Sequence, residues 1–217
     1  MSNVHILNEN RSVFNHFIAE IRDVKIQKDP LRFRRNLERI GEMMAFTLSQ
    51  ELSYKSVDVS TPLGIATEQL IKDELVLATV LRAGLPMHTG FLNLFDRAGN
   101  AFVSAYRKSH EGGEIEVEVE YLSSPDLGGK VLVIIDPMLA TGKSLWLAYQ
   151  ALLKRGTPAR VHVAAAIAST QGLEYLQAHL PQDTHFWIGA LDKELNTLSY
   201  IVPGLGDAGD LAYGEKV

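Results

Sequence analysis

The residues whose types and spacing are best suited to binding or catalysis lie between Asp136 and Ser144. Asp136 directly follows the apolar run Val131–Ile135. Short apolar runs rich in β-branched residues are typical of strands that are buried on both faces of a parallel sheet. Because open α/β sheets bind ligands beyond the carboxyl ends of their strands, Asp136 is expected at a binding site. An ionised carboxylate only accepts hydrogen bonds, so a ligand bound to it would supply the donors.

The loop after Asp136 is predicted to bind an anion. Its end, Thr141-Gly142-Lys143-Ser144, is small, polar and basic, and residues 145–154 contain no Gly or Pro and predict a helix. The start of a helix presents free backbone N–H groups and the positive end of the helix dipole, which together bind phosphate. The unit is therefore predicted to be a strand, an acid, a phosphate loop and a helix, in that order.

Arg82 is a second candidate on the ligand side of the sheet. It follows a second buried strand, predicted over residues 74–81, and precedes a helix predicted over residues 87–95. The strand-end argument that applies to Asp136 therefore applies here too. The small residues Ala83 and Gly84 would let the backbone approach a ligand closely. A structural salt bridge is the alternative role for this arginine.

Arg107 opens a predicted hairpin. A strand is predicted over residues 101–106, and between residues 115 and 121 apolar residues alternate with glutamates. That period of two indicates a half-exposed strand. We interpret residues 107–125 as a flap, which would exclude water by closing over a site. A plain surface hairpin fits the same pattern.

The tail, residues 200–210, is predicted to be a binding loop. Three glycines and a proline in this span argue against a regular element. Its apolar residues Ile201, Val202 and Leu205 favour burial over a flexible terminus. A rigid loop that offers backbone N–H and C=O groups suits the edge of a flat heterocycle, and glycines allow the close approach.

The remaining patterns predict one α/β domain over residues 1–217. Strands that alternate with helices imply right-handed crossovers and a central parallel sheet flanked by helices. Residues 55–67 are broken by Pro62 and Gly64 and predict short strands and a turn. The other expected elements are a helix capped by Ser12, a helix that starts at Asp29-Pro30 and repeats Phe33, Leu37, Ile40, Met44 and Leu48, strands over 160–167 and 185–190, and a helix over 171–179.

The totals exclude several classes of protein. A chain of 217 residues can bury roughly 70% of its unfolded surface in one domain. The net charge of −5 argues against a nucleic-acid partner held by bulk electrostatics. With no cysteine, disulfides, thiolate metal sites and a thiol nucleophile are excluded. No run is long enough to span a membrane and residues 1–10 lack a signal pattern, so a cytoplasmic protein is expected.

The segment from Asp136 to Ser144 resembles the phosphoribosyl diphosphate (PRPP) motif of the phosphoribosyltransferases. Its form Asp-Pro-Met-Leu-Ala-Thr-Gly resembles that of the uracil phosphoribosyltransferases, which place proline where most relatives carry a second acid. The resemblance extends in order over residues 80–85, Tyr106-Arg107 and 200–210. Lys143 departs from the pattern, because the uracil enzymes often carry a small residue there.

The resemblance implies a type I phosphoribosyltransferase fold with a flap and a C-terminal base-binding hood. It implies transfer of the phosphoribosyl group from PRPP to uracil, giving UMP and diphosphate, with Mg²⁺ carried mainly by PRPP. A dimer or tetramer is expected, and some relatives respond to GTP. The implied catalytic residues are Arg107, Asp136 and Asp207. Those implied to bind PRPP are Arg82, Arg107, Asp136, Pro137, Met138, Leu139, Ala140, Thr141, Gly142, Lys143, Ser144 and Asp207, and those implied to bind uracil are Ile201, Gly206, Asp207 and Ala208.

Several alternatives stay open from the sequence. Asp207 is one candidate base for the uracil N1 proton, but a metal-water or loop-positioning role fits it as well. A P-loop kinase would need glycine at position 137, where Pro137 also lacks an N–H group. A pyrimidine-sensing regulator that binds RNA would need a basic face, whereas the basic residues are scattered among acids. A phosphoribosyltransferase for another base is the third alternative.

Overall fold

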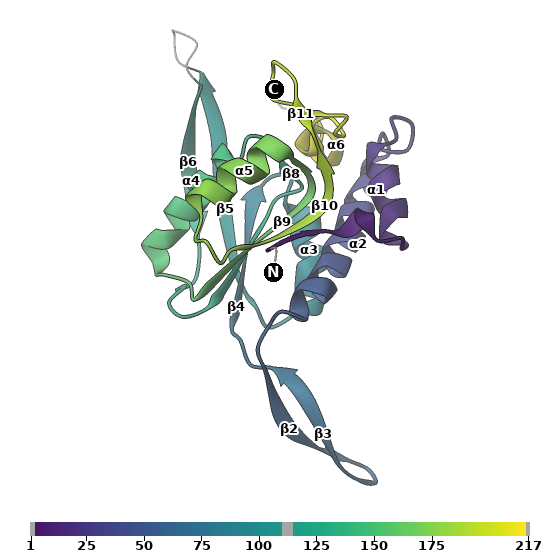
Figure 1. The fold of residues 1–217 in the computed structure, drawn as a ribbon, viewed down its shortest axis with the longest axis vertical. Helices are drawn as coiled ribbons and strands as arrows, with labels where there is room; N and C mark the ends of the chain where they lie inside the picture. Colours follow the sequence, from purple (N-terminus) through teal and green to yellow (C-terminus); the bar gives the residue numbers. More distant parts are fainter. Residues whose placement is uncertain (1–2, 110–114, 216–217) are drawn as a thin grey trace.

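The computed structural model describes residues 3–109 and 115–215, with side chains outside residues 105–119 (Figure 1). Its centre is a sheet in which neighbouring strands are parallel, except for the antiparallel pair β5 and β6. The predicted central parallel sheet is therefore confirmed. In sheet order the strands are β1 (Val4–Ile6), β10 (His185–Asp192), β9 (Arg160–Ser169), β7 (Val131–Ile135), β4 (Leu75–Leu81), β5 (Gly99–Ser109) and β6 (Ile115–Ser123), and β8 (Met138–Leu139) adds to β9.

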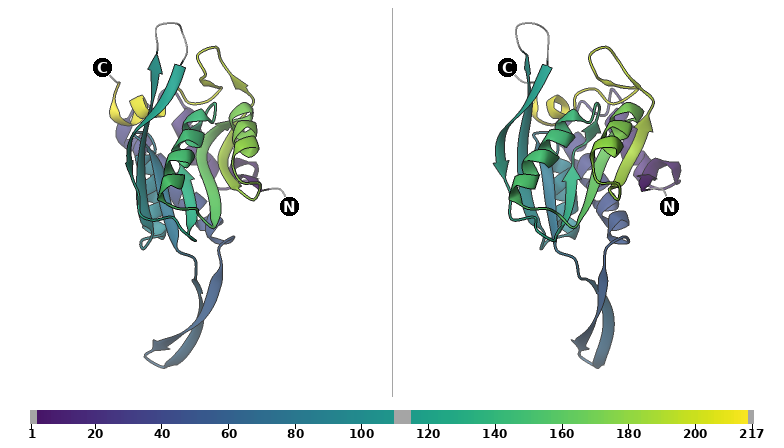
Figure 2. Two further views of the ribbon diagram at one scale, coloured as in Figure 1. Left: turned by 90° about the vertical axis from the view of Figure 1, so that its left-hand side faces the viewer. Right: turned by 60° about the vertical axis from the view of Figure 1, so that its left-hand side comes forward.

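Helices cover both faces of the sheet (Figures 1 and 2). The strand β7 shows why its sequence is apolar throughout: Val133 and Ile135 belong to one hydrophobic core, and Leu132 and Ile134 to the other. On the first face lie α1 (Phe14–Arg22), α2 (Pro30–Ser49), α3 (Leu85–Leu94) and α6 (Ala208–Tyr213), and on the second lie α4 (Lys143–Leu152) and α5 (Thr170–His179).

The long helix α2 follows its sequence signals closely. Asp29 is the N-cap, and its carboxylate accepts hydrogen bonds from the backbone N–H groups of Leu31 and Arg32. Pro30 occupies the first turn, where its missing N–H group costs nothing. The five apolar residues that repeat at helical spacing, Phe33, Leu37, Ile40, Met44 and Leu48, are all buried.

The segment predicted as short strands and a turn is longer than expected. β2 (Tyr54–Thr61) and β3 (Gly64–Ile71) pair in full register as an antiparallel arm that extends away from the sheet (Figures 1 and 2). Most of its side chains are exposed. The strand pattern was therefore weak, because alternation between an apolar and a polar face requires a core on one side. The N-terminal strand β1 was also missed, since three residues carry too little pattern.

Two predictions near the ends of the sheet have different outcomes. The hairpin predicted over residues 107–125 is present as β5 and β6, where the backbone of Arg107 pairs with that of Val117. Its side chains at residues 105–119 lie outside the described part of the structure. The tail, predicted as irregular, contains β12 (Ile201–Val202), paired with β11 (Glu194–Leu195), and the helix α6. A cap at Asp207 allows this helix to form despite Gly209.

The structure also bears on the ends of the helices and on membrane association. The helix after the phosphate loop begins at Lys143, two residues earlier than predicted, because Gly142 acts as its N-cap. Short 3₁₀ turns occur at Leu7–Glu9 and Leu153–Arg155. None of the helices in the described part of the chain is long and apolar enough to cross a membrane.

Candidate active site

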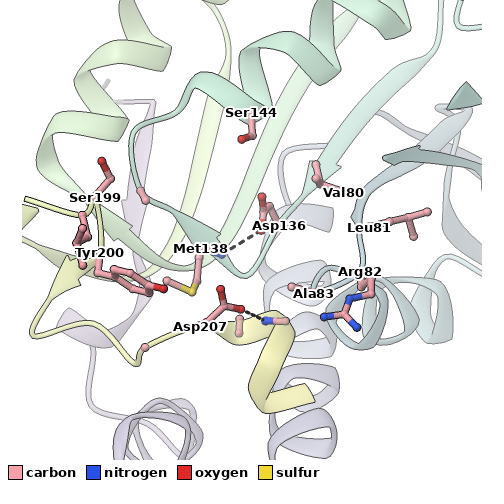
Figure 3. Close-up of a pocket in the computed structure, with 15 residues that line it drawn as sticks. Val80, Leu81, Arg82, Ala83, Asp136, Met138, Ser144, Ser199, Tyr200 and Asp207 are labelled. Atoms are coloured by element: carbon pink, nitrogen blue, oxygen red, sulfur yellow. Dashed lines mark hydrogen bonds between the residues drawn. The ribbon is translucent and has the colours of Figure 1, made fainter. Parts of the chain in front are cut away.

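A cavity of about 410 Å³ lies at the carboxyl ends of β4 and β7 (Figure 3). These strands are neighbours, but the chain leaves them in opposite directions, from β4 toward β5 and from β7 toward β9. Such a reversal of strand order opens the crevice in which α/β sheets bind ligands. The predicted site residues that the cavity brings together are Arg82, Asp136, Met138, Ala140, Ser144, Gly206, Asp207 and Ala208.

The Asp136 carboxyl group is held at the end of β7 and faces the cavity (Figure 3). Its backbone N–H donates to the Ala164 carbonyl at 3.1 Å, and its Oδ1 accepts the Met138 N–H at 3.2 Å. Burial raises the pKa of Asp136 to about 7, with a further increase from the charge of Asp207 and an opposing effect from the Met138 N–H. Burial by the protein alone therefore leaves this carboxyl group near its titration point at neutral pH.

The loop from Ala140 to Ser144 forms a phosphate cradle. It lines a second, small cavity of about 60 Å³. Gly142 adopts a φ of +78°, and a side chain there would place its Cβ 2.9 Å from the carbonyl oxygen of Gly172. In the part of the chain that the structure describes, no group accepts a hydrogen bond from the N–H groups of residues 141–145. These donors are free for an anion.

Ser169 fixes the orientation of this cradle from behind. Its buried hydroxyl donates to the Ala140 carbonyl at 2.6 Å and accepts the N–H of Gly172 at 2.9 Å. Because the peptide group is planar and trans, the N–H of Thr141 points opposite to the Ala140 carbonyl. Ser169 therefore turns one backbone donor away from α5 and toward the side of the loop that carries the cavity. The sequence did not single out this residue.

Three predicted PRPP-binding residues differ in their surroundings. Pro137 and Leu139 are buried, and the Leu139 side chain belongs to the core between the sheet and α4. Only their backbone can face a ligand, and Leu139 lines the small cavity. Lys143 is exposed and lines neither cavity. Its ammonium group is therefore not part of the cradle in this structure.

The tail completes the cavity with backbone and one aromatic ring. Asp207 caps α6, with its Oδ1 accepting the N–H groups of Gly209 at 2.8 Å and Asp210 at 3.0 Å. Of the residues predicted to bind uracil, Gly206, Asp207 and Ala208 line the cavity. Ile201 does not, because its side chain is packed in the core, so its contact stays a prediction for the backbone.

Leu198 and Ser199 precede the binding loop predicted over residues 200–210, and with Tyr200, the first residue of that loop, they form a hood that lines the cavity. Asn196 shapes this hood, because its Oδ1 accepts the N–H groups of Leu198 at 3.0 Å and Tyr200 at 2.9 Å. The sequence offered one signal, an aromatic residue at the start of a glycine-rich tail. Figure 3 shows Tyr200 beside Met138 and Asp207.

Arg82 lines the cavity, but its guanidinium group contacts α6 (Figure 3). Its Nη2 donates to the Gly214 carbonyl at 3.2 Å and lies 3.6 Å from Oδ1 of Asp210. Its Nε is buried without a hydrogen-bond partner among the described residues. The Leu81–Arg82 peptide bond is cis. Arg107 lies in β5, and its side chain is outside the described part of the structure, so its predicted role stays a prediction.

The cavity suits a magnesium ion that arrives with a ligand. Carboxylate oxygens are ligands that Mg²⁺ prefers, and Asp136 and Asp207 both line the cavity. Across residues 3–109 and 115–215, no three His, Asp or Glu side chains converge to hold a metal ion by themselves. The donors present therefore fit a metal that also has the oxygens of a bound diphosphate.

Comparisons with known proteins identify the family of the chain. A family model described as uracil phosphoribosyltransferase matches residues 8–215. The uracil phosphoribosyltransferase of Porphyromonas gingivalis is 54% identical over 211 residues, which cover 97% of this chain and 98% of that protein. The uracil phosphoribosyltransferase of Methanothermobacter thermautotrophicus is 40% identical over 189 residues, with 86% of each chain covered.

Solved structures show the fold. The structure of the AQ2163 protein from Aquifex aeolicus superposes with a TM-score of 0.87 at 29% identity and covers 99% of both chains. An orotate phosphoribosyltransferase of Mycobacterium tuberculosis in complex with PRPP has a TM-score of 0.51 at 14% identity, over 86% of this chain and 95% of that one, and shows the fold alone. The resemblance in the sequence motifs is confirmed: the chain has the type I phosphoribosyltransferase fold and belongs to the uracil phosphoribosyltransferase family.

Proposed function

We propose that the protein transfers the phosphoribosyl group of PRPP to N1 of uracil and releases UMP and diphosphate. The observation that carries this proposal is the crevice at the carboxyl ends of β4 and β7, where the larger and the smaller cavity share the lining residues Asp136, Met138, Ala140 and Ser144. It joins a phosphate cradle, a carboxyl group at a strand end and a loop that exposes its backbone. These three parts match the 5′-phosphate, the ribose hydroxyls and the pyrimidine edge of the two substrates.

The phosphate cradle and Asp136 fix the sugar. The 5′-phosphate binds to the N–H groups of residues 141–145 at the start of α4, where the helix dipole favours negative charge. The Asp136 carboxylate accepts hydrogen bonds from both ribose hydroxyls. Its pKa near 7 in the empty site means that sugar binding must favour the ionised form, and two hydroxyl donors do so.

Diphosphate departure breaks the bond between the anomeric carbon and a diphosphate oxygen, and a new bond forms to N1 of uracil. Positive charge builds on the sugar and negative charge on the diphosphate. Arg82 and Arg107 are proposed to oppose the negative charge, and Asp136 to stabilise the positive charge across the ring. When bound, Mg²⁺ would add positive charge at the diphosphate oxygens, next to Asp136 and Asp207.

Asp207 is proposed to position the loop rather than to act as the base. One of its oxygens already accepts two backbone N–H groups of α6, which makes the carboxylate a fixed part of the base-binding loop. That arrangement supports the loop-positioning alternative. The acceptor of the uracil N1 proton is not assigned to a residue.

A product assay tests the proposal. The purified protein is incubated with PRPP, MgCl₂ and uracil, cytosine, hypoxanthine or guanine, and nucleotides are separated by chromatography. We expect UMP from uracil and little product from the other bases, because backbone groups on a short loop fit a small pyrimidine edge and exclude a purine by size. Faster turnover of a purine would contradict the assignment.

The finer features are tested in the same setting. Chelation of Mg²⁺ should stop the reaction. A titration with GTP shows whether this member responds to the effector, and light scattering during size-exclusion chromatography separates a dimer from a tetramer. Measurements of ATP hydrolysis and RNA binding test the kinase and regulator alternatives, for which we expect no signal.

A further inference from the structure

A bidentate ion pair lies directly behind the base-binding loop. Arg22 ends α1 and Asp192 ends β10, and their side chains meet through two hydrogen bonds of 2.8 Å each. The Asp192 side chain is 8% exposed and the Arg22 side chain 22%. Neither residue lines the cavity, so neither is placed to contact a substrate.

This ion pair holds both polar backbone groups of one glycine in the tail. The N–H of Gly204 donates to Oδ2 of Asp192 at 2.9 Å, and Nη1 of Arg22 donates to the Gly204 carbonyl at 3.0 Å. Gly204 has a φ of +55°, and a Cβ there would lie 2.1 Å from the Ile201 carbonyl oxygen. The ion pair therefore fixes the path of the chain into the cavity at position 204, where only glycine fits without strain.

The uncharged side chain of Gln27 holds the next residue of the loop, Leu205, by its backbone carbonyl. With its amide nitrogen facing the two carbonyls, Gln27 donates to Ile21 at 2.8 Å and to Leu205 at 2.9 Å. Since the Leu205 carbonyl faces Gln27, the N–H of Gly206 in the same planar peptide points away from Gln27. Gly206 itself lines the cavity. The orientation of this donor is thus set by a side chain that lies outside the site.

Backbone recognition makes such support necessary. A side chain can change rotamer to meet a ligand, whereas a backbone N–H or C=O group points wherever the chain path directs it. The loop from Pro203 to Asp207 has no regular secondary structure of its own. A small error in its path would misdirect several groups at once, which costs most where a site must match fixed donors and acceptors.

We propose that Arg22, Asp192 and Gln27 are positioning residues that determine how tightly and how selectively the site binds the pyrimidine base. This inference rests on the proposed function. The alternative is that the ion pair only joins α1 to β10. A structural role of that kind would lower stability and leave the kinetics of the folded enzyme unchanged.

The test compares three variants with a matched control. Asp192→Asn keeps the size of the side chain and removes its charge, Arg22→Lys keeps the charge and removes the two-pronged donor, and Gln27→Leu removes one neutral donor. The control, Asp73→Asn, breaks another Arg–Asp ion pair, formed with Arg160 at the opposite end of the sheet. Values of kcat, of KM for uracil and for PRPP, and of Tm are measured for each, together with direct binding of PRPP.

We expect kcat/KM for uracil to fall by about 10- to 100-fold in Asp192→Asn, the range for the loss of a charge-assisted hydrogen bond, and by several-fold in Gln27→Leu. The KM and Kd for PRPP should stay within about threefold of wild type, because the substitutions remove support from the base-binding loop and leave the phosphate cradle intact. The preference for uracil over cytosine should fall more in Asp192→Asn than in Gln27→Leu. The control should lose Tm and keep both KM values.

The possible failures are distinguishable. If the wild type makes no UMP, the proposed function is wrong. If the wild type makes UMP but the variants lose only Tm, or lose affinity for PRPP and uracil equally, the positioning role is wrong and the function stands. Should Asp192→Asn fail to fold, Gln27→Leu and Arg22→Lys decide the question, since neither leaves a buried charge without a partner.

Discussion

Replacing Asp136 by asparagine should stabilise the ligand-free protein at alkaline pH while it abolishes activity. In the proposed reaction this carboxylate binds the ribose, but in the protein alone its charge is unfavourable, because burial raises the pKa of Asp136 to about 7. A group whose pKa is raised by folding contributes stability below its unfolded pKa and loses that contribution as the pH rises through the folded pKa. Asparagine has nearly the same shape and no charge, so it escapes this loss.

The size of the effect follows from the two pKa values. For an unfolded pKa of 3.8 and a folded pKa of about 7, linkage gives a loss of about 2.6 kcal/mol between pH 5 and pH 8. The side chain keeps some contact with solvent in the cavity, so solvent screening reduces the expected value to about 1–2 kcal/mol. The stability advantage of Asp136→Asn should grow by this amount between the two pH values.

The assay is urea unfolding of both proteins, without ligand, at pH 5 and pH 8. The comparison must be a difference, because burial also lowers the pKa values of His5, His88 and His162, so that the unfolded chain takes up protons on these histidines more readily than the folded protein does. Their contribution cancels between wild type and variant. A difference in unfolding free energy that does not change with pH, or a variant that is less stable than wild type at pH 8, would refute the reasoning.

Three further substitutions test other parts of the site. Arg107→Ala should lower kcat by roughly 100-fold with Tm unchanged, the scale for one preorganised donor; lower Tm with normal kcat would indicate a structural arginine. Lys143→Gly should raise the KM for PRPP less than about tenfold and leave kcat nearly unchanged, with a smaller effect at higher salt, because the side chain is exposed. A collapse of kcat would instead place Lys143 in the transition state. Gly172→Ala would set a Cβ 2.1 Å from the Ala140 carbonyl oxygen, so we expect a loss of about 1–3 kcal/mol in unfolding free energy and a higher KM for PRPP; unchanged calorimetry and kinetics would show that the loop can move.

The sequence predicted the parts of the fold that local pattern determines. The continuous apolar run at β7 and the capped start of α2 were clear because burial on two faces and helix capping each have a distinct pattern. Asp136 and Arg82 line the cavity at the ends of their strands, because the end of a parallel strand is a position that sequence alone can locate.

The features that were missed depend on contacts between distant segments. Arg22 and Asp192 are 170 residues apart, and nothing near either residue indicates its partner. The hood at Tyr200 is shaped by the side chain of Asn196, whose role is visible only once the loop has folded. The arm formed by β2 and β3 lacks a packed face, so the usual alternation of burial never arises.

The contact between Arg82 and the end of α6 means that a backbone carbonyl of the protein competes with diphosphate for a hydrogen bond from this arginine. In the proposed reaction the guanidinium group binds diphosphate, yet here its Nη2 already donates to the Gly214 carbonyl. A diphosphate oxygen that binds this N–H group displaces the carbonyl, so that contact exchanges one hydrogen bond for another, whereas a contact with a free N–H group of Arg82 adds a new one. The other end of the same helix is capped by Asp207, which lies in the base-binding loop. Any factor by which an occupied base site changes diphosphate affinity must therefore, by thermodynamic reciprocity, reappear as the factor by which diphosphate changes the affinity for the base.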